Sequence, residues 1–555
     1  MPASLPPLLF TPARHYLKPM PKPCGMQSGL RWYWWLALAA TAGLIMLLNL
    51  VRLVLGVIIA VVWLVTNPKV QIWFWVNGIH RELRQPNADP PAAPAHAPVT
   101  LATNAAALRT APDLFRAINV WDAHLKFTSN QWAALEPKSV PPIRDFLKPD
   151  GSATLRNPAA IRPGLAGVLG IDLPWSAGEV EFGGLRFTNV AARFKGNGTF
   201  LGAVRSHKRS FKLDLNQEAP GQRLAGRSTL NFHNLVADPS NLHDAMACEF
   251  FREAGVPAPR TAFARLRLTV GGRFENRLLG LYLLVENPDA AWAREQFGVD
   301  GVALFKPVTY ELFANLGDDW AAYAPVYDPK TKTTAAQQGR LIALAKFFSA
   351  AGETQFAAEI GKFIDLPEFA SFLACQALLA NYDSILSNGQ NFLLYLDPRT
   401  DRFGFIPWDH DHCWGQFPFI GTADERAHAS VREPWVGPDR FLARMVAVPA
   451  VRQLYEAELK RLRETLFVPE RLSRRLDELA AVVRPFIAEE STERLGKFES
   501  VTGNPRTNAL SGQKAAGAER PGLPLKEFFA TRAESVSAQL AGQSEGVILK
   551  RKSPW

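Results

Sequence analysis

The strongest hydrophobic feature of the chain is the run from residue 32 to residue 65, in which Arg52 is the single charged side chain. A bilayer-spanning helix needs about 20 apolar residues, so the run is long enough for one tilted transmembrane helix. No small-residue cleavage site follows it, which predicts an uncleaved anchor. Four basic residues precede the run and three follow it closely. This small excess favours a cytoplasmic N-terminus, with the body of the protein outside the cytoplasm.

Beyond this run, apolar positions first alternate with the period of strands and later recur with the period of helices. Strands are predicted at the start of 119–137, within 184–200, 207–216 and 301–308, and as a hairpin over 261–287. Helices are predicted from Ser129, within 228–260 and over most of 335–380, 437–490 and 523–542. Residues 492–523 show no periodicity and predict a long loop.

These patterns predict an α+β body behind a membrane helix. The predicted divisions are a basic flexible tail (1–30), the transmembrane anchor (31–66), a Pro/Ala-rich linker (67–112), the folded body (113–545, with a long loop at 496–522) and a short tail (546–555).

Composition changes this picture little. The 555 residues are 47% hydrophobic and 21% charged, as in a globular protein with one added apolar segment. The net charge of +10 is spread through the body without a basic run or a nucleic-acid motif, so nucleic acid is not an expected partner. The four cysteines have no C-x-x-C spacing, which argues against a disulfide framework or a structural zinc site.

Candidate chemistry concentrates in residues 381–415. Two segments rich in aromatic and aliphatic residues flank the turn sequence DPRT and predict a β-hairpin. Antiparallel pairing would bring Asn391 beside Asp409 and Asp411 at one edge, and Asp383 opens the segment. Because carboxylate and amide oxygens are the ligands of hard divalent cations, this edge predicts a Mg²⁺ or Mn²⁺ site.

The sequence DHDHC within this segment raises the alternative of a transition-metal site. In a strand, Asp409, Asp411 and Cys413 would face one side and His410 and His412 the other, so at most three ligands share a side. The two imidazoles are then more simply outward-facing or supporting groups.

A second candidate region is the pair of predicted strands within 184–216. Its glycine-bearing turn and the basic residues after it are Lys195, Gly196, Gly198, Lys208 and Lys212. Backbone N–H groups and cations of such a turn can surround a phosphate, whereas the alternative is a simple loop turn. Glu286 and Lys306, at two predicted strand ends, either pair structurally or contribute to nucleotide binding.

In their order along the chain, these segments resemble the spore-coat protein H kinase family of atypical protein-kinase-like proteins. The resemblance covers about residues 119–542 and rests on the turn at Lys195 and on KRSFKLDLN, LVADPSNLHDAMACEFFREAGVPAP, GLYLLVEN, LFKP, NYDSILSNGQNFLLYLDP and FIPWDHDHCWG. It implies a kinase-like two-lobed fold, β-rich and then α-rich, that uses ATP with Mg²⁺ or Mn²⁺ to phosphorylate protein hydroxyls.

The resemblance also implies roles for the acidic and amide residues. Asp383 matches the aspartate that accepts the proton of the substrate hydroxyl, and Asp409, with Asp411 close by, matches the metal-binding aspartate. The spacing of ordinary kinases selects Asn388 as a further metal ligand, whereas the Asn-x-x-x-Tyr pattern of this family selects Asn391. We favour Asn391 because it begins the strand nearest Asp409.

For the nucleotide, Lys208 matches the K-x-S/P-F/Y-K strand of the family and ranks first as the phosphate contact, and Lys306 matches its K-P strand end. The other residues expected at the nucleotide are Lys195, Gly196, Gly198, Lys212 and Glu286.

Two functions are therefore open. The first is a membrane-anchored protein kinase acting on serine or threonine hydroxyls, and the presence of every expected acidic residue favours it. The second is a non-catalytic envelope or surface scaffold with the same fold. The anchor, the linker and the difficulty of supplying ATP outside the cytoplasm favour this second function.

Overall fold

The computed structural model describes residues 101, 104–137, 172–196, 199–200, 203, 206–309, 311–437, 440–503 and 522–550, with six positions between 36 and 46. The chain divides into two compact units, Met1–Gln71 and Ile72–Trp555. In the first unit the six described positions are helical. Of all described residues, none belongs to a helix that is both long and apolar enough to span a bilayer. The predicted tail (1–30) and, apart from those six positions, the predicted anchor (31–66) lie outside the described residues.

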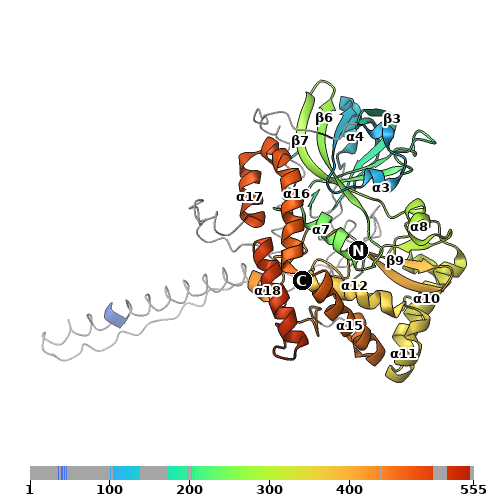
Figure 1. Cartoon of the computed structure of the whole chain (residues 1–555), viewed down its shortest axis with the longest axis vertical. Coiled ribbons are helices and arrows are strands. Elements are labelled where there is room, and N and C mark those ends of the chain that lie inside the picture. Colours follow the sequence, from blue (N-terminus) through green and yellow to red (C-terminus); the bar gives the residue numbers. More distant parts are fainter. Residues whose placement is uncertain are drawn as a thin grey trace, which may run out of the picture. The chain divides into compact units, whose positions relative to one another are not determined.

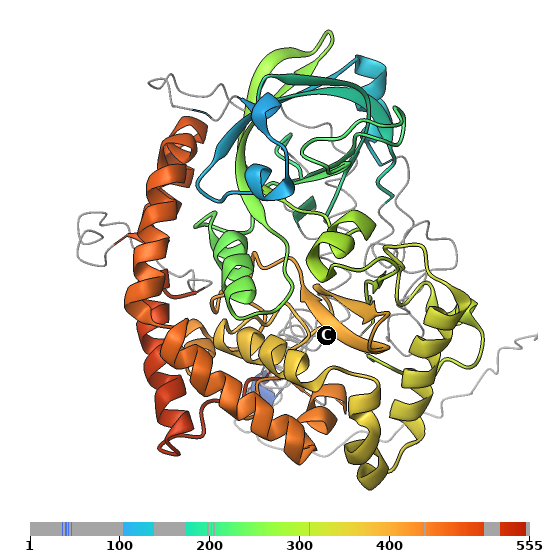
Figure 2. The ribbon, with the colours of Figure 1, turned by 45° about the vertical axis from the view of Figure 1, so that its right-hand side comes forward.

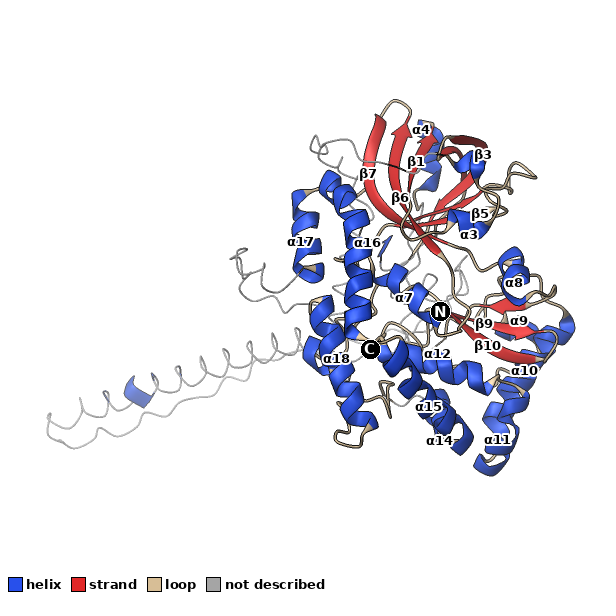
Figure 3. Cartoon of the chain, viewed as in Figure 1, coloured by secondary structure: helices blue, strands red, loops and turns tan. Residues whose placement is uncertain are grey.

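The second unit begins with a closed barrel (Figures 1 and 3). Its strands, in barrel order, are β1 (Val120–Phe127), β2 (Ser176–Phe182), β3 (Leu185–Phe194), β4 (Phe211–Asp214), β5 (Thr229–His233), β7 (Phe274–Val285) and β6 (Thr261–Val270). Neighbouring strands are antiparallel, except that β1 closes the barrel against β6 in parallel. Alternate side chains point inward to form one core. The period-two pattern predicted β1, β3, β4, β6 and β7 correctly, whereas β2 and β5 were not predicted as strands.

A small sheet in the other part of this unit carries the predicted hairpin. It consists of β8 (Ala303–Phe305), β9 (Phe392–Asp397) and β10 (Arg402–Pro407), with β9 in the middle. Strands β9 and β10 are antiparallel, with Phe392 opposite Pro407, and the Trp408 N–H donates to the Asn391 carbonyl at 3.1 Å. The predicted register of the hairpin is therefore confirmed.

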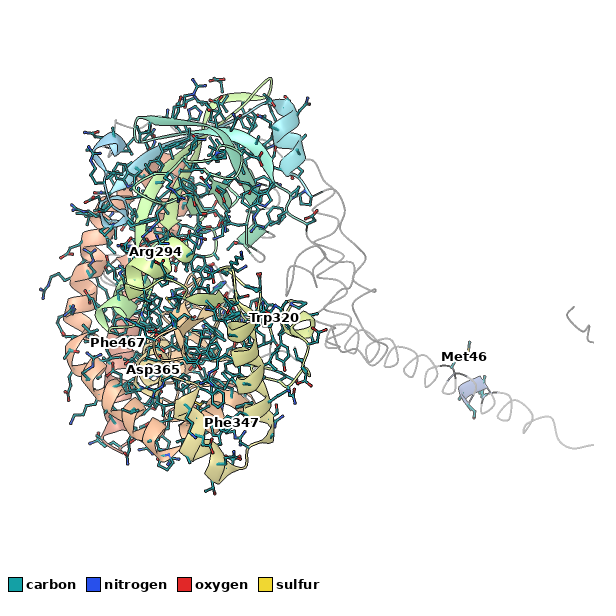
Figure 4. All side chains as sticks on the ribbon, turned by 90° about the vertical axis from the view of Figure 1, so that its right-hand side faces the viewer. Met46, Arg294, Trp320, Phe347, Asp365 and Phe467 are labelled. Carbon is teal, nitrogen blue, oxygen red and sulfur yellow. The ribbon has the colours of Figure 1, made fainter. Side chains whose placement is uncertain are left out.

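Helices surround this sheet and complete the unit. They are α8 (Ala290–Phe297), α9 (Trp320–Tyr323), α10 (Ala335–Ala350), α11 (Glu353–Glu359), α12 (Leu366–Leu378), α13 (Ala423–Ala427), α14 (Arg440–Ala447), α15 (Pro449–Thr465) and α18 (Leu525–Leu540). The unit also contains four shorter helices, which are the 3-10 helices η1 (Ala105–Ala107) and η3 (Ile360–Lys362) and the α-helices α3 (Ala111–Leu114) and α4 (Ser129–Leu135). Helix α12 is buried along most of its length, as expected for a helix that is apolar on nearly every side. Side chains fill both the barrel interior and the helical part (Figure 4).

Two helices connect the barrel to the helical part. Helix α7 (His243–Glu253) lies below the barrel, and α16 (Pro469–Glu490) runs alongside both parts (Figures 1 and 2). At the barrel end of α16, Glu489 pairs with Arg265 at 3.0 Å. Nearer its start, Arg475 pairs with Glu249 of α7 at 2.7 Å. These ion pairs join elements that are far apart in the sequence.

Three predicted boundaries were wrong. Helix α17 (Thr492–Thr502) occupies the start of the predicted loop at 496–522, because the Ser491 side chain caps it and Phe498 and Thr502 bury one side. The helix has too few apolar positions to show a helical period in the sequence. The rest of the predicted loop, residues 504–521, lies outside the described residues. At the N-terminal side, folded structure begins before residue 113, since the Ala105 N–H donates to Gly183 at 2.8 Å. The predicted tail from 546 also starts in folded structure, because Val547 pairs with Ala429.

Candidate active site

A cavity of about 450 Å³ lies where the barrel meets the helical part. Its basic lining residues are Arg193, Lys195, Lys212, Lys306 and Lys330, and its acidic ones are Asp244, Asp328, Asp409 and Asp411. The barrel strands β3, β4 and β5 supply one wall, and the residues after β10 supply the other. Cations and carboxylates therefore face the same enclosed space, as a phosphate with a bound metal ion requires.

The turn after β10 places the two acidic residues of that wall. Strand β10 ends at Pro407, and Asp409 adopts a left-handed backbone with φ 61°. Such a conformation costs of order 1–3 kcal/mol for a residue other than glycine, and it recurs at functional sites. Asp409 and Asp411 line the cavity. The indole of Trp408 lies beneath the Lys195 ammonium, 5.2 Å from the ring centroid.

Asp383 is half-buried next to this wall and is not among the residues that line the cavity. It follows α12, and its carboxylate comes within 4.8 Å of ligand atoms of Asp411 and His412. The Asn388 amide donates to its carboxylate at 2.5 Å, and the Asn391 amide donates to its backbone carbonyl at 2.7 Å. Of these two asparagines, Asn391 is among the residues that line the cavity and Asn388 is not.

Crowding of carboxylates changes their protonation. Burial, and then the charges of Asp409 and Asp383, raise the pKa of Asp411 well above its ordinary value. Burial also raises the pKa of Asp383; Asp409 adds to this effect, whereas His412 and the two asparagines oppose it. A cation among these oxygens would remove the repulsion. The donor set of carboxylates with the Asn391 amide thus fits a hard divalent ion.

The sequence missed two polar residues at the base of the cavity. His233, the last residue of β5, and Asp244, in the first turn of α7, lie in the segment 228–260, for which only a helix was predicted. Both line the cavity, and their ligand atoms come within 4.8 Å of those of Asp409. Burial opposes ionisation of Asp244, but the hydrogen bond and charge of His233 outweigh it and lower the pKa of Asp244 to about 2. The sequence did carry a signal for them, because the segments FHN (232–234) and LHDA (242–245) place polar residues inside otherwise apolar elements.

Three predicted nucleotide-binding lysines do lie at the cavity, namely Lys195, Lys212 and Lys306. Burial, with the neighbouring charges of Lys306 and Lys212, lowers the pKa of Lys195 to about 7, although Asp409 opposes the shift. Burial and the charges of Arg193 and Lys330 lower the pKa of Lys212 to about 8. Gly196 also lines the cavity with φ 86°, while Gly198 lies outside the described residues.

The residue ranked first, Lys208, does not reach the cavity. Its ammonium pairs with Glu490 of α16 at 2.5 Å and lies 5.5 Å from the ring centre of Tyr282. Glu286 is also elsewhere, fully buried between Arg227 and Arg260 at 2.9 and 2.8 Å. Both side chains are engaged in ion pairs, and neither lines the cavity.

The strand geometry assumed for DHDHC was wrong, because these residues follow the strand instead of continuing it. His410 is fully buried and stacks on Phe251 with ring centroids 5.1 Å apart. Cys413 is buried and donates to the His243 carbonyl at 3.7 Å, while His412 lies beside Asp383. Of the three residues expected on one side, Asp409 and Asp411 line the cavity together, whereas Cys413 does not line it.

The fold and the cavity define an α+β protein, in which a β-barrel part faces an α-rich part across the cavity. A family model described as CotH kinase protein matches residues 192–534. The chain belongs to this family, which confirms the resemblance found in the sequence.

Individual relatives are more distant. The inner spore coat protein H of Bacillus subtilis (strain 168) is 25% identical over 284 residues, which are 50% of this chain and 74% of that protein. Among solved structures, the proinflammatory kinase CtkA of Helicobacter pylori matches with a TM-score of 0.20 and 11% identity, over 64% of this chain and 92% of that one. The HipA, HipB and operator DNA complex of Shewanella oneidensis MR-1 matches with a TM-score of 0.21 and 14% identity, over 49% and 57%.

Proposed function

We propose that the chain is a metal-dependent atypical protein kinase that transfers the γ-phosphate of ATP to serine or threonine hydroxyls of a protein. The observation that carries this proposal is the cavity itself, in which Lys195, Lys212 and Lys306 face Asp409 and Asp411. Phosphoryl transfer needs little covalent help from a protein, but it needs cations around the phosphates and a positioned base. Membership of a kinase family supports the same reaction.

The roles follow from position. Lys195 and Lys306 would neutralise phosphate oxygens, and both lie near the Trp408 ring, at 5.2 and 6.0 Å from its centroid. Asp409, Asp411 and Asn391 would hold Mg²⁺ or Mn²⁺, and the ion would supply positive charge to offset that of the phosphates. In this proposal the raised pKa of Asp383 suits a group that accepts the proton of the acceptor hydroxyl.

Phosphate transfer by the purified full-length chain tests the proposal directly. Radiolabelled ATP with Mg²⁺ or Mn²⁺ should label the chain itself or a generic protein acceptor. Asp383→Asn and Asp409→Asn should each lower the rate at least about 100-fold, as loss of a catalytic acid–base group or a metal ligand does. Asp300→Asn, at a side chain 75% exposed and away from the cavity lining, is the matched control and should retain the rate. Absence of both ATP binding and transfer in the wild type would reject a kinase.

One observation favours the second function, a non-catalytic scaffold of the same fold. Asp383 is not among the cavity-lining residues, and the Asn388 amide already donates to its carboxylate. A scaffold would keep its cellular role in the Asp383→Ala variant and lose it only when the gene is deleted. A kinase would lose that role in both cases.

We further propose that the protein is associated with the cell envelope through a single N-terminal membrane helix at residues 31–66. The apolar run at 32–65 supports this, and the relative is a spore coat protein. Topology reporters fused at the C-terminus test the orientation. A signal only from the cytoplasmic reporter would contradict a body outside the cytoplasm.

A further inference from the structure

A chain of hydrogen bonds runs from the cavity into helix α7. The Lys195 ammonium contacts Nε2 of His233 at 2.5 Å, and Nδ1 of the same ring contacts Asp244 at 3.2 Å. The second carboxylate oxygen of Asp244 accepts from the His410 N–H at 3.1 Å. These contacts join a barrel strand, the connecting helix and the segment after β10, which are three separate elements of the fold.

The protonation of the histidine follows from its partners. In the state in which Lys195 is an ammonium group, that group can only donate, so Nε2 of a neutral His233 accepts from Lys195. The ring proton is then on Nδ1 and is donated to the Asp244 carboxylate, which fixes both the tautomer and the orientation of the ring. The ring also meets Trp408 edge to face, with centroids 5.9 Å apart. His233 therefore presents one lone pair, in one direction, to Lys195.

We infer that His233 and Asp244 form a positioning pair that holds Lys195 at the phosphates of a bound nucleotide. In protein kinases a strand lysine is held by a glutamate from a helix, through a direct ion pair. Here the helix residue is an aspartate, which is shorter, and the imidazole spans the remaining distance. Glu286 and Glu490 are engaged elsewhere, the first with Arg227 and Arg260 and the second with Lys208.

This inference rests on the proposed function, because Lys195 needs a positioning pair only if it contacts a nucleotide. The pair acts through the lysine and touches no reacting atom. His233→Leu removes the acceptor at similar size, whereas His233→Gln keeps an amide oxygen that can accept from Lys195. Asp244→Asn offers an amide that can donate to Nδ1, which would move the ring proton to Nε2 and place N–H against ammonium.

Steady-state kinetics with ATP and Mn²⁺ on the full chain test the pair. His233→Leu and Asp244→Asn should each lower kcat/KM for ATP about ten-fold, mostly through KM, as for the loss of one coupled interaction. For His233→Gln, kcat/KM for ATP should lie within about three-fold of the wild-type value, because the amide oxygen still accepts from Lys195. His124→Leu is the control, since His124 lies on β1, bonded to Thr269 at 2.9 Å and outside the cavity lining. It should leave kcat/KM unchanged.

The decisive comparison uses Lys195→Met as a second background. A residue that acts through Lys195 should have no further effect once that lysine is gone. A further ten-fold loss on adding His233→Leu would show a structural role and overturn the inference. Loss of Mn²⁺ binding without nucleotide in His233→Leu, measured by electron paramagnetic resonance, would make His233 a metal ligand and overturn it as well. If the wild type transfers phosphate and His233→Leu matches it, the inference alone fails. If the wild type binds no ATP, the proposed function fails with it.

Discussion

Replacing Asp411 by asparagine removes one charge from a crowded group of carboxylates. Ligand atoms of Asp411 and Asp383 lie within 4.8 Å, and burial and these neighbours raise the pKa of Asp411 well above its ordinary value. At an effective dielectric constant of about 20, two charges at that distance repel by roughly 3 kcal/mol. Because partial protonation already relieves some of this repulsion, we expect Asp411→Asn to stabilise the metal-free protein by about 1–2 kcal/mol at pH 8.

The pH dependence has a definite sign. A carboxyl group whose pKa is raised by folding destabilises the protein increasingly as pH rises above 3.8, its value before folding, until the folded-state pKa is passed. The advantage of the variant should therefore be larger at pH 8 than at pH 5. With Mg²⁺ or Mn²⁺ the order should reverse, because the wild type gains binding energy that the variant has lost.

Thermal melting of the full chain measures these differences, without metal and with Mg²⁺ at about 5 mM, a concentration chosen to exceed the dissociation constant of the site. A gain of about 1–2 kcal/mol should raise Tm by a few degrees. Asp300→Asn serves as the exposed control and should not shift Tm at either pH. If Asp411→Asn is less stable than the wild type without metal at pH 8, and equally so at pH 5, carboxylate repulsion is not the dominant effect and the argument is refuted.

Three further predictions concern other residues. Lys208→Met should keep the affinity for ATP within about two-fold of the wild type, because Lys208 pairs with Glu490 and does not line the cavity. A ten-fold loss of affinity in a nucleotide-binding titration would show that Lys208 does contact the nucleotide. Arg426→Met should lower the free energy of unfolding by about 3 kcal/mol or more in urea denaturation, since the buried guanidinium donates to three backbone carbonyls at 2.6–2.7 Å; a loss below about 1 kcal/mol would contradict this. Glu368→Gln should be nearly neutral at pH 5 and stabilising at pH 8, because burial raises the pKa of Glu368 well above 4.5 and the amide oxygen can still accept from the Phe405 N–H; equal effects at both pH values would show that the carboxyl is not held neutral.

Local patterns sufficed for most of the elements. The β9–β10 hairpin was predictable because apolar strands flank a short turn, and its register brings Asn391 to the residues after Pro407. Helix α12 was predictable because Pro367 occupies its first turn and apolar residues fill it. Helix α17 was not, because its stability comes from the Ser491 cap and from Phe498 packing against distant residues rather than from its own periodicity.

What the sequence by itself determined is therefore most of the strands and helices and the acidic segment around Asp409, since these depend on neighbours within a few positions. Tertiary structure alone decided which polar groups share the cavity. Lys195 and Lys208 both flank the same strand pair, yet barrel closure directs the first to Trp408 and the second to Glu490 of α16. In the same way, helix α7 reaches the cavity only through packing, which brings Asp244 to His233. Side-chain direction around a closed barrel depends on contacts between residues hundreds of positions apart, and no local pattern carries that information.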